Sequence, residues 1–196
     1  MIAKPATTDT EIHPLLQNRW SGRAFDPSRR LDEETLAALA EAARWAPSCM
    51  NAQPWRFTPV VRNKDSAWDP VLGTLAASNR IWAEHAPLLL VVAAETQFAD
   101  GKPNRWAPYD AGAAMMALSI QATALGLMVH QMGGFNPESL RDVLALPAHW
   151  ALLSVAAIGY QLPKEKVPSS LEEREFAPRT RQSIETIWQK PGHQNP

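Results

Sequence analysis

Three polar residues near the start of the chain, Arg19, Ser21 and Arg23, have the chemistry of an anion-binding site. They alternate within residues 18–25, so a turn of the backbone would bring them together around one anion. Arginine donates paired hydrogen bonds to a phosphate, and a serine hydroxyl adds a short donor. The segment is therefore a candidate phosphate site. Composition alone favours the alternative, a solvated basic stretch that leads into the first helix.

A second candidate segment covers residues 46–57, where Pro47 and Pro54 bracket a loop that carries Ser48, Asn51 and Gln53. Each amide side chain offers a donor and an acceptor together, which matches the imide-like edge of a heterocycle. The alternative is a helix-to-strand connection whose amides bind their own backbone. Taken alone, the segment fits either interpretation.

A third segment, residues 131–135, places Gly133 and Gly134 directly after a predicted strand. Paired glycines let backbone N–H groups approach a ligand without a Cβ in the way. The alternative is a plain turn into a helix that Asn136 caps. The sequence lacks the glycine-rich nucleotide motifs, the nucleophile elbow and the zinc-protease motif. Its five histidines have no metal-ligand spacing, so we expect no metal site.

The 196-residue chain carries 19 lysines and arginines against 20 aspartates and glutamates, a net charge of −1. This balance argues against nucleic acid or an anionic membrane as the main partner. The one cysteine, Cys49, excludes a disulfide framework and fits a reducing compartment. Residues 1–10 lack the apolar core of an export signal, so we expect a cytoplasmic location. Eight tryptophans suggest aromatic surfaces to be covered in a core, an interface or a ring-binding pocket.

Apolar periodicity and capping residues predict helices and strands in irregular alternation, which indicates an α+β domain with a small sheet. Asp32, Asp110 and Asn136 are expected to cap helices. Residues 111–137 carry no formal charge, but their polar residues and glycines favour a fully buried helix over a membrane span. The predicted helices cover residues 31–45, 71–86 (in one or two pieces), 111–125, 137–144 and 183–189, and the predicted strands cover 57–61, 88–94, 127–130 and 152–160.

Taken together, the three segments resemble the FMN-dependent nitroreductase family. The strongest element is Arg19-x-Ser21-x-Arg23-x-Phe25 followed by the loop at residues 46–55, and Gly133-Gly134-Phe135 supports it. The resemblance covers residues 18–181. It implies one domain over residues 1–196, with a core at about 15–162 and a C-terminal arm at about 163–196. The implied fold is nitroreductase-like: a small, mostly antiparallel sheet surrounded by helices, with a long central helix buried at a homodimer interface.

The same resemblance implies that FMN is held between two subunits. Its phosphate would be bound by arginines and Ser21, and Arg23 would lie nearer the pyrimidine edge, where its charge stabilises the anionic reduced flavin. The loop at residues 47–51 would come from the other subunit. No side chain is assigned a catalytic role, because flavin N5 carries the chemistry. The implied cofactor-binding residues are Arg19, Trp20, Ser21, Arg23, Pro47, Ser48, Cys49, Asn51, Asn79, Gln131, Met132, Gly133, Gly134, Arg179 and Arg181.

The reaction implied by the resemblance is a two-step cycle. NADH or NADPH delivers a hydride to flavin N5, and a nitroaromatic, quinone or related electron-poor acceptor then takes it. Two alternatives stay open: a related flavin, ene- or dehalogenating reductase, and a non-catalytic FMN-binding protein. Trp20 and Gly22 fill the variable slots of the phosphate motif, while Trp82 replaces a basic residue that some members have. Trp82 and Trp106 are candidates for the wall of the pocket.

Overall fold

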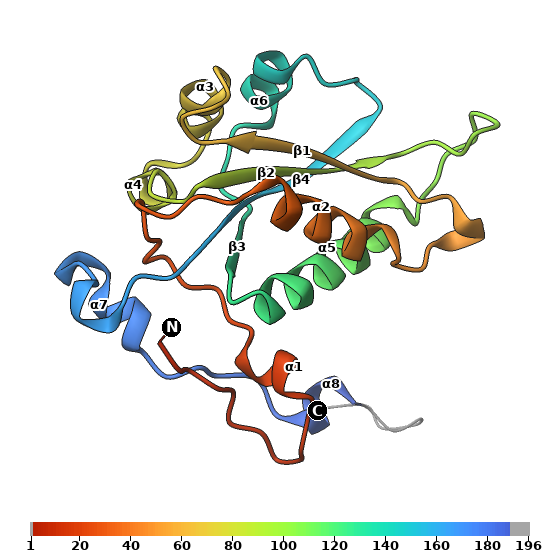
Figure 1. The fold of residues 1–196 in the computed structure, drawn as a ribbon. Helices are drawn as coiled ribbons and strands as arrows, with labels where there is room; N and C mark the ends of the chain where they lie inside the picture. Colours follow the sequence, from red (N-terminus) through yellow and green to blue (C-terminus); the bar gives the residue numbers. More distant parts are fainter. Residues whose placement is uncertain (1, 189–196) are drawn as a thin grey trace.

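The computed structural model describes residues 2–188. Four strands form one antiparallel sheet in the order β1-β2-β4-β3 (Figure 1). The central strands β2 and β4 pair from Leu88 opposite Ile158 to Glu95 opposite Trp150, with one irregularity after Val92. The sheet is small and antiparallel, as the resemblance implies. The strand bounds are β1 Trp55–Val61, β2 Leu88–Glu95, β3 Met128–Met132 and β4 Trp150–Gly159.

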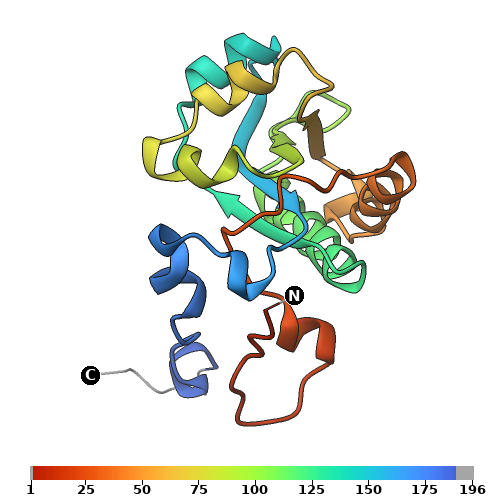
Figure 2. The same cartoon turned by 60° about the vertical axis from the view of Figure 1, so that its left-hand side comes forward.

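Helices cover both faces of the sheet (Figures 1 and 2). Side chains alternate between the two faces along each strand, and apolar side chains on both faces have to be covered. Leu88 and Leu90 of β2 pack in a cluster with α2 (Glu33–Arg44) and α5 (Ala107–Ala124). Leu89 and Val91 point the other way and pack with α3 (Trp68–Gly73), α4 (Ala77–Ala83) and α6 (Pro137–Leu144). Strand β2 is therefore buried on both faces, which explains why its sequence is apolar from Leu88 to Ala94.

The N-terminal and C-terminal segments of the described chain lie side by side, below the sheet in Figures 1 and 2. The backbone N–H of Ile2 donates to Oε1 of Gln161 at 2.8 Å, and Lys4 Nζ donates to the backbone carbonyl of Glu175 at 2.8 Å. The predicted helix at 183–189 is shorter than expected, and its last residue lies outside the described residues. The helices of these terminal segments are α1 Pro14–Asn18, α7 Ser169–Phe176 and α8 Ile184–Ile187, with short 3-10 turns η1 at Cys49–Asn51 and η2 at Lys164–Lys166.

Two of the three predicted helix caps are confirmed. Asp32 accepts a hydrogen bond from the Thr35 N–H at 2.7 Å, and Asn136 accepts one from Ser139 at 2.9 Å. The prediction for Asp110 is wrong. Helix α5 begins at Ala107, with a proline in its first turn, a position that proline favours. Asp110 therefore lies inside the helix and binds a different segment.

Helix α5 is buried along one side in the single chain. Met115 and Leu118 are buried against the sheet and α2, and Ala111 is buried beside Ala94 of β2, whereas Tyr109 and Met116 are exposed. The open side is the one that the resemblance assigns to a second copy of the chain, and its burial there stays a prediction. No helix within residues 2–188 is long and apolar enough to cross a membrane.

Candidate cofactor site

Arg19, Arg179 and Arg181 lie close together beside α1. The predicted phosphate site requires such a group of positive charges. The Arg179 guanidinium donates to the backbone carbonyls of Lys4 at 2.8 Å, Gln17 at 2.7 Å and Arg19 at 2.9 Å. These bonds hold the C-terminal segment against the start of the phosphate motif. Arg19 Nη1 lies 3.5 Å from the Ser21 hydroxyl, so these two predicted anion donors are adjacent.

The charges of these arginines act on one another. Burial, followed by the positive charge of Arg181, lowers the pKa of Arg19 below its usual value. Burial, followed by the charges of Arg19 and Arg181, lowers the pKa of Arg179. Within the described residues, none of the three forms a salt bridge with a carboxylate. A dianionic phosphate would supply the missing negative charge, and its oxygens would accept from the guanidinium N–H groups.

Arg23 lies on a different side of the same segment. Its guanidinium carbon is 5.8 Å from the centre of the Trp82 ring, which ties the phosphate motif to α4. Trp82 is 1% exposed and packs on His130 with ring centres 4.5 Å apart. Trp82 is thus a core residue and not a wall of a pocket, whereas Trp106 is partly exposed before α5.

His130 is a neutral part of this cluster. Its Nδ1 lies 3.0 Å from the Gly22 carbonyl, so Nδ1 carries the proton and donates it. Burial lowers the pKa of His130 to about 4, against a smaller opposing effect of the bond to Gly22. The imidazole therefore adds no charge to the arginine-rich side of the molecule at neutral pH.

The double glycine lies beside the predicted flavin-facing amide. Asn79 Nδ2 is 3.4 Å from the Gly134 carbonyl, and the Ala76 N–H donates to the same carbonyl at 2.9 Å. Gly133 is exposed, with open space where a Cβ would stand. Met132 is 2% exposed and belongs to the core, so only its backbone is available to a ligand. Gln131 is exposed, and its side chain accepts from Ser154 at 3.2 Å.

The loop after α2 is held by Asp110, which the sequence led us to expect as a helix cap. The backbone N–H of Cys49 donates to Asp110 Oδ2 at 3.0 Å, and Ser48 Oγ accepts from the Gln53 N–H at 3.0 Å. Met50, Asn51 and Gln53 all adopt positive φ angles of 48–54°. Pro47, Met50 and Asn51 are exposed, so this rigid loop presents its surface outward.

Two groups of predicted site residues lie at opposite ends of α5 (Figure 1), while the double glycine lies beside Asn79 of α4. The loop at 47–53 is bound to Asp110 in the first turn of α5. Arg19 and Trp20 instead line a small cavity with Thr123 near the last turn. Thirteen residues separate Asp110 from Thr123, which is roughly 20 Å at the helical rise of 1.5 Å per residue. The single chain does not bring the two groups to one ligand.

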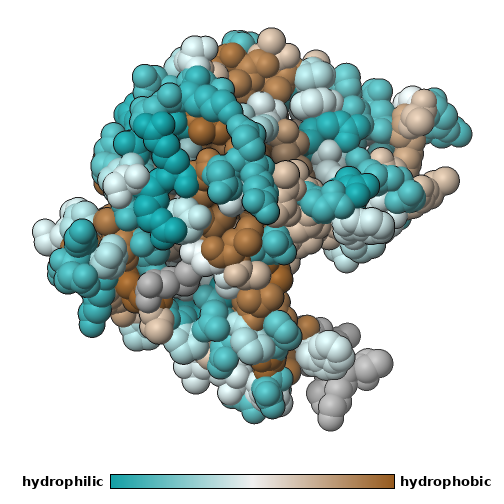
Figure 3. Space-filling model, in the orientation of Figure 1, coloured by the Kyte–Doolittle hydropathy of each residue, from teal (hydrophilic) through white to brown (hydrophobic). Residues whose placement is uncertain are grey.

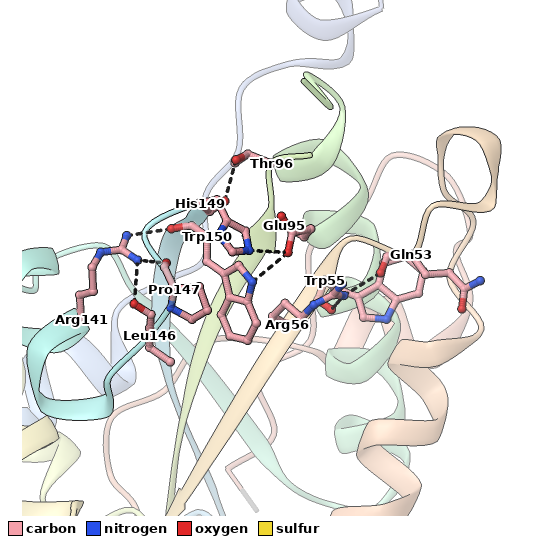
Figure 4. Close-up of polar contacts among 10 residues, drawn as sticks. All are labelled: Gln53, Trp55, Arg56, Glu95, Thr96, Arg141, Leu146, Pro147, His149 and Trp150. Atoms are coloured by element: carbon pink, nitrogen blue, oxygen red, sulfur yellow. Dashed lines mark hydrogen bonds and ion pairs between the residues drawn. The ribbon is translucent and has the colours of Figure 1, made fainter. Parts of the chain in front are cut away.

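Sequence reasoning missed a polar cluster where β2 ends and β4 begins (Figure 4). Glu95 Oε2 lies 3.1 Å from His149 Nε2 and accepts from the Trp150 indole N–H at 3.0 Å. Glu95 and His149 line an open cavity of about 890 Å³ together with Arg56 and Asn51. The available signal was a charged residue directly after an apolar strand. No group of three potential metal ligands occurs within residues 2–188.

Comparison with known proteins gives a consistent result. The model of the nitroreductase family matches residues 16–80 and 67–160 of this chain. The major NAD(P)H-flavin oxidoreductase of Aliivibrio fischeri is 26% identical, over 89% of this chain and 97% of the relative. The 5,6-dimethylbenzimidazole synthase of Rhodospirillum rubrum is 31% identical, over 83% of this chain and 87% of the relative.

Among solved structures, one described as an oxidoreductase containing FMN superimposes with a TM-score of 0.87. It is 33% identical, and the alignment covers 96% of this chain and 95% of that one. The four strands, Arg19 and the double glycine lie within the residues that the family model matches. The chain therefore belongs to the nitroreductase family.

Proposed function

We propose that this protein is an FMN-dependent NAD(P)H oxidoreductase that reduces nitroaromatic, quinone or related electron-poor acceptors. The observation that carries the proposal is the group of Arg19, Arg179 and Arg181, none of which has a carboxylate partner in the described chain. Burial, followed by the positive charges of the neighbouring arginines, lowers the pKa of Arg19 and of Arg179. A phosphomonoester is the ligand whose charge and geometry match this group. The printed name of the structural neighbour with 33% identity, an oxidoreductase containing FMN, supports the same cofactor.

The residues present fit FMN at both of its ends. Arg19, Ser21 and Arg181 would hold the phosphate, while Arg179 fixes the backbone around them. The exposed backbone beside Gly133, with no atom where a Cβ would stand, leaves a flat ring room to approach. Arg23, anchored on Trp82, is the positive charge available to the pyrimidine edge.

The functional unit that we propose is a homodimer. The loop at residues 47–53 and the arginine group are about 20 Å apart in one chain by the rise of α5, so a second copy must supply the loop that completes each site. The exposed side of α5, which includes Tyr109 and Met116, is the surface that we assign to this contact. Two hydrogen bonds, from the Cys49 N–H to Asp110 and from the Gln53 N–H to Ser48, already hold the loop in the single chain.

FMN bound here would supply hydride transfer from NADH or NADPH to the acceptor. The chain contributes binding, orientation and charge. Its arginines would fix the cofactor in place. His130 is neutral at neutral pH and therefore adds no positive charge beside Arg23 and Trp82. Water can supply the proton that the reduced acceptor needs, so no side chain has to act as an acid.

Purification of the protein tests the proposal directly. We expect a yellow protein that releases FMN on denaturation and bleaches anaerobically with NADH or NADPH. Reoxidation by a panel of nitroaromatic and quinone acceptors would then identify the acceptor class. A colourless protein that FMN fails to reconstitute would refute the proposal, and bleaching without reoxidation by either class would refute the acceptor assignment. An FMN complex that neither nucleotide bleaches would indicate a non-catalytic flavin-binding protein.

A further inference from the structure

Helix α7 places a carboxylate inside the protein next to the phosphate motif. Glu175 is 0% exposed, although charged residues are almost never fully buried unless they are paired. Within the described residues it forms no salt bridge with a lysine or arginine. Its Oε1 instead accepts from the backbone N–H groups of Arg23 and Ala24, the latter at 3.2 Å, and its Oε2 accepts from Gln161 at 3.5 Å.

The residues in the variable slots of the motif make this contact possible. A Cβ on Gly22 would stand 3.0 Å from Glu175 Oε2, 2.9 Å from the Trp20 ring and 2.2 Å from the Met128 sulfur. A Cβ at this position would crowd both the Trp20 ring and the carboxylate, so the glycine gives the carboxylate room to reach the backbone of the next two residues. The glycine in this slot is therefore matched to a glutamate about 150 residues further along the chain.

The N-terminal segment closes the same region from the other side. Lys4 Nζ donates to the backbone carbonyl of Glu175 at 2.8 Å and lies 4.5 Å from the centre of the Trp20 ring. The charge of Glu175 also acts on the Arg23 guanidinium. Burial and the charge of Arg174 lower the pKa of Arg23, and the negative charge of Glu175 raises it in opposition. Glu175 thus acts on Arg23 in two ways, through the backbone N–H and through its charge.

We propose that Glu175 is a positioning residue for the flavin site, which holds the backbone at Arg23 and Ala24 and partly offsets the Arg23 charge. The role in flavin chemistry rests on the proposed function, because Arg23 is the charge that we assign to the pyrimidine edge. The backbone role is a property of the chain itself and can be measured without cofactor. The two roles predict different outcomes for different substitutions.

Glu175→Gln separates charge from position, because it keeps a carbonyl oxygen for the two N–H groups and removes the negative charge. A positive environment favours reduced flavin, so removal of the charge should favour it further. We expect reduced FMN to gain about tenfold in affinity over oxidised FMN, as for one buried charge acting at short range. That is a rise of about 30 mV in the midpoint potential of a two-electron couple. Glu173→Gln, on the exposed side of the same helix, is the matched control and should leave the potential unchanged.

Glu175→Asp keeps the charge and withdraws the carboxylate by one methylene group. We expect it to keep a potential near that of the wild-type protein while the peptide spanning residues 19–25 exchanges its amide hydrogens faster, as followed by mass spectrometry. Weaker FMN binding should accompany the faster exchange. This variant keeps the proposal testable if Glu175→Gln fails to fold, and the exchange measurement does not depend on bound flavin.

The outcomes distinguish this inference from the proposed function. A wild-type protein that binds no FMN refutes the proposed function and the redox role, while amide exchange still decides the backbone role. Equal potentials in Glu175→Gln and Glu173→Gln would overturn the charge effect. Unchanged exchange of residues 19–25 in Glu175→Asp would overturn the positioning role.

Discussion

Replacement of His130 should remove a defined part of the protein's acid sensitivity. The pKa of His130 is about 4 in the folded protein, mainly because of burial, against an ordinary value of 6.5. Between these values the unfolded chain binds a proton that the folded chain does not, so stability rises with pH. The stability that the neutral His130 gives the folded state, relative to acidic pH, is fully present above pH 6.5 and is lost as the pH falls toward 4.

The size of the effect follows from the two pKa values. At pH 5 the unfolded imidazole is largely protonated and the folded one largely neutral, which costs about 2 kcal/mol of folding free energy relative to pH 7.5. His130→Gln has no group to titrate there. The wild-type protein should therefore lose about 2 kcal/mol more than the variant between pH 7.5 and pH 5.

Urea unfolding at the two pH values, at equal flavin saturation, measures this difference. Contributions from other titrating groups cancel when the wild-type protein and the variant are compared. His13→Gln, which removes an exposed imidazole, controls for the loss of a histidine as such. If His130→Gln and the wild-type protein lose the same stability on acidification, then His130 is not a buried neutral base and the reasoning fails.

Three further substitutions test separate contacts. Arg19→Ala should weaken FMN binding by about 10- to 100-fold, the value of one charge-assisted hydrogen bond, and riboflavin binding much less; equal losses for both in fluorescence titrations would show that Arg19 does not bind the phosphate. Asp110→Ala removes the acceptor of the Cys49 N–H and should cost about 1–3 kcal/mol of unfolding free energy, with an unchanged urea midpoint as the contrary result. Gly22→Ala would drive a Cβ into the Met128 sulfur, so its thermal midpoint should fall by several degrees; a midpoint equal to that of the wild-type protein would show that the segment adapts.

Local signals in the sequence predicted much of the fold. Asp32 and Asn136 cap helices because the Asx side chain and the N–H group that it binds are three residues apart, which is visible in the sequence. Asp110 also precedes an apolar segment, as a helix cap would. However, Pro108 suits the first turn of a helix, so α5 begins at Ala107, before Asp110. Its actual partner, Cys49, is 61 residues away.

The parts of the site that escaped prediction depend on contacts between distant segments. The sequence places Trp82 on a helix but does not show which residues surround it. Only the fold shows that Phe25 and His130 pack against its ring. Glu175 lies in a charged stretch that gave no helix signal, and a glutamate is expected at the surface. Its burial follows from a hydrogen bond with a segment 152 residues earlier. The resemblance implied Arg19, Arg179 and Arg181 as cofactor-binding residues, but not the backbone carbonyls of Lys4, Gln17 and Arg19 to which Arg179 donates.

The separation of the two residue groups along α5 has a genetic consequence. If each site takes its arginines from one copy and its loop from the other, a defect in Arg19 and a defect in Asn51 damage different halves of a site. A mixed dimer of the two variants would contain one doubly damaged site and one with every residue intact. Two variants that are each inactive should then restore activity to one another when they are unfolded and refolded together, with about a quarter of all sites intact after random pairing.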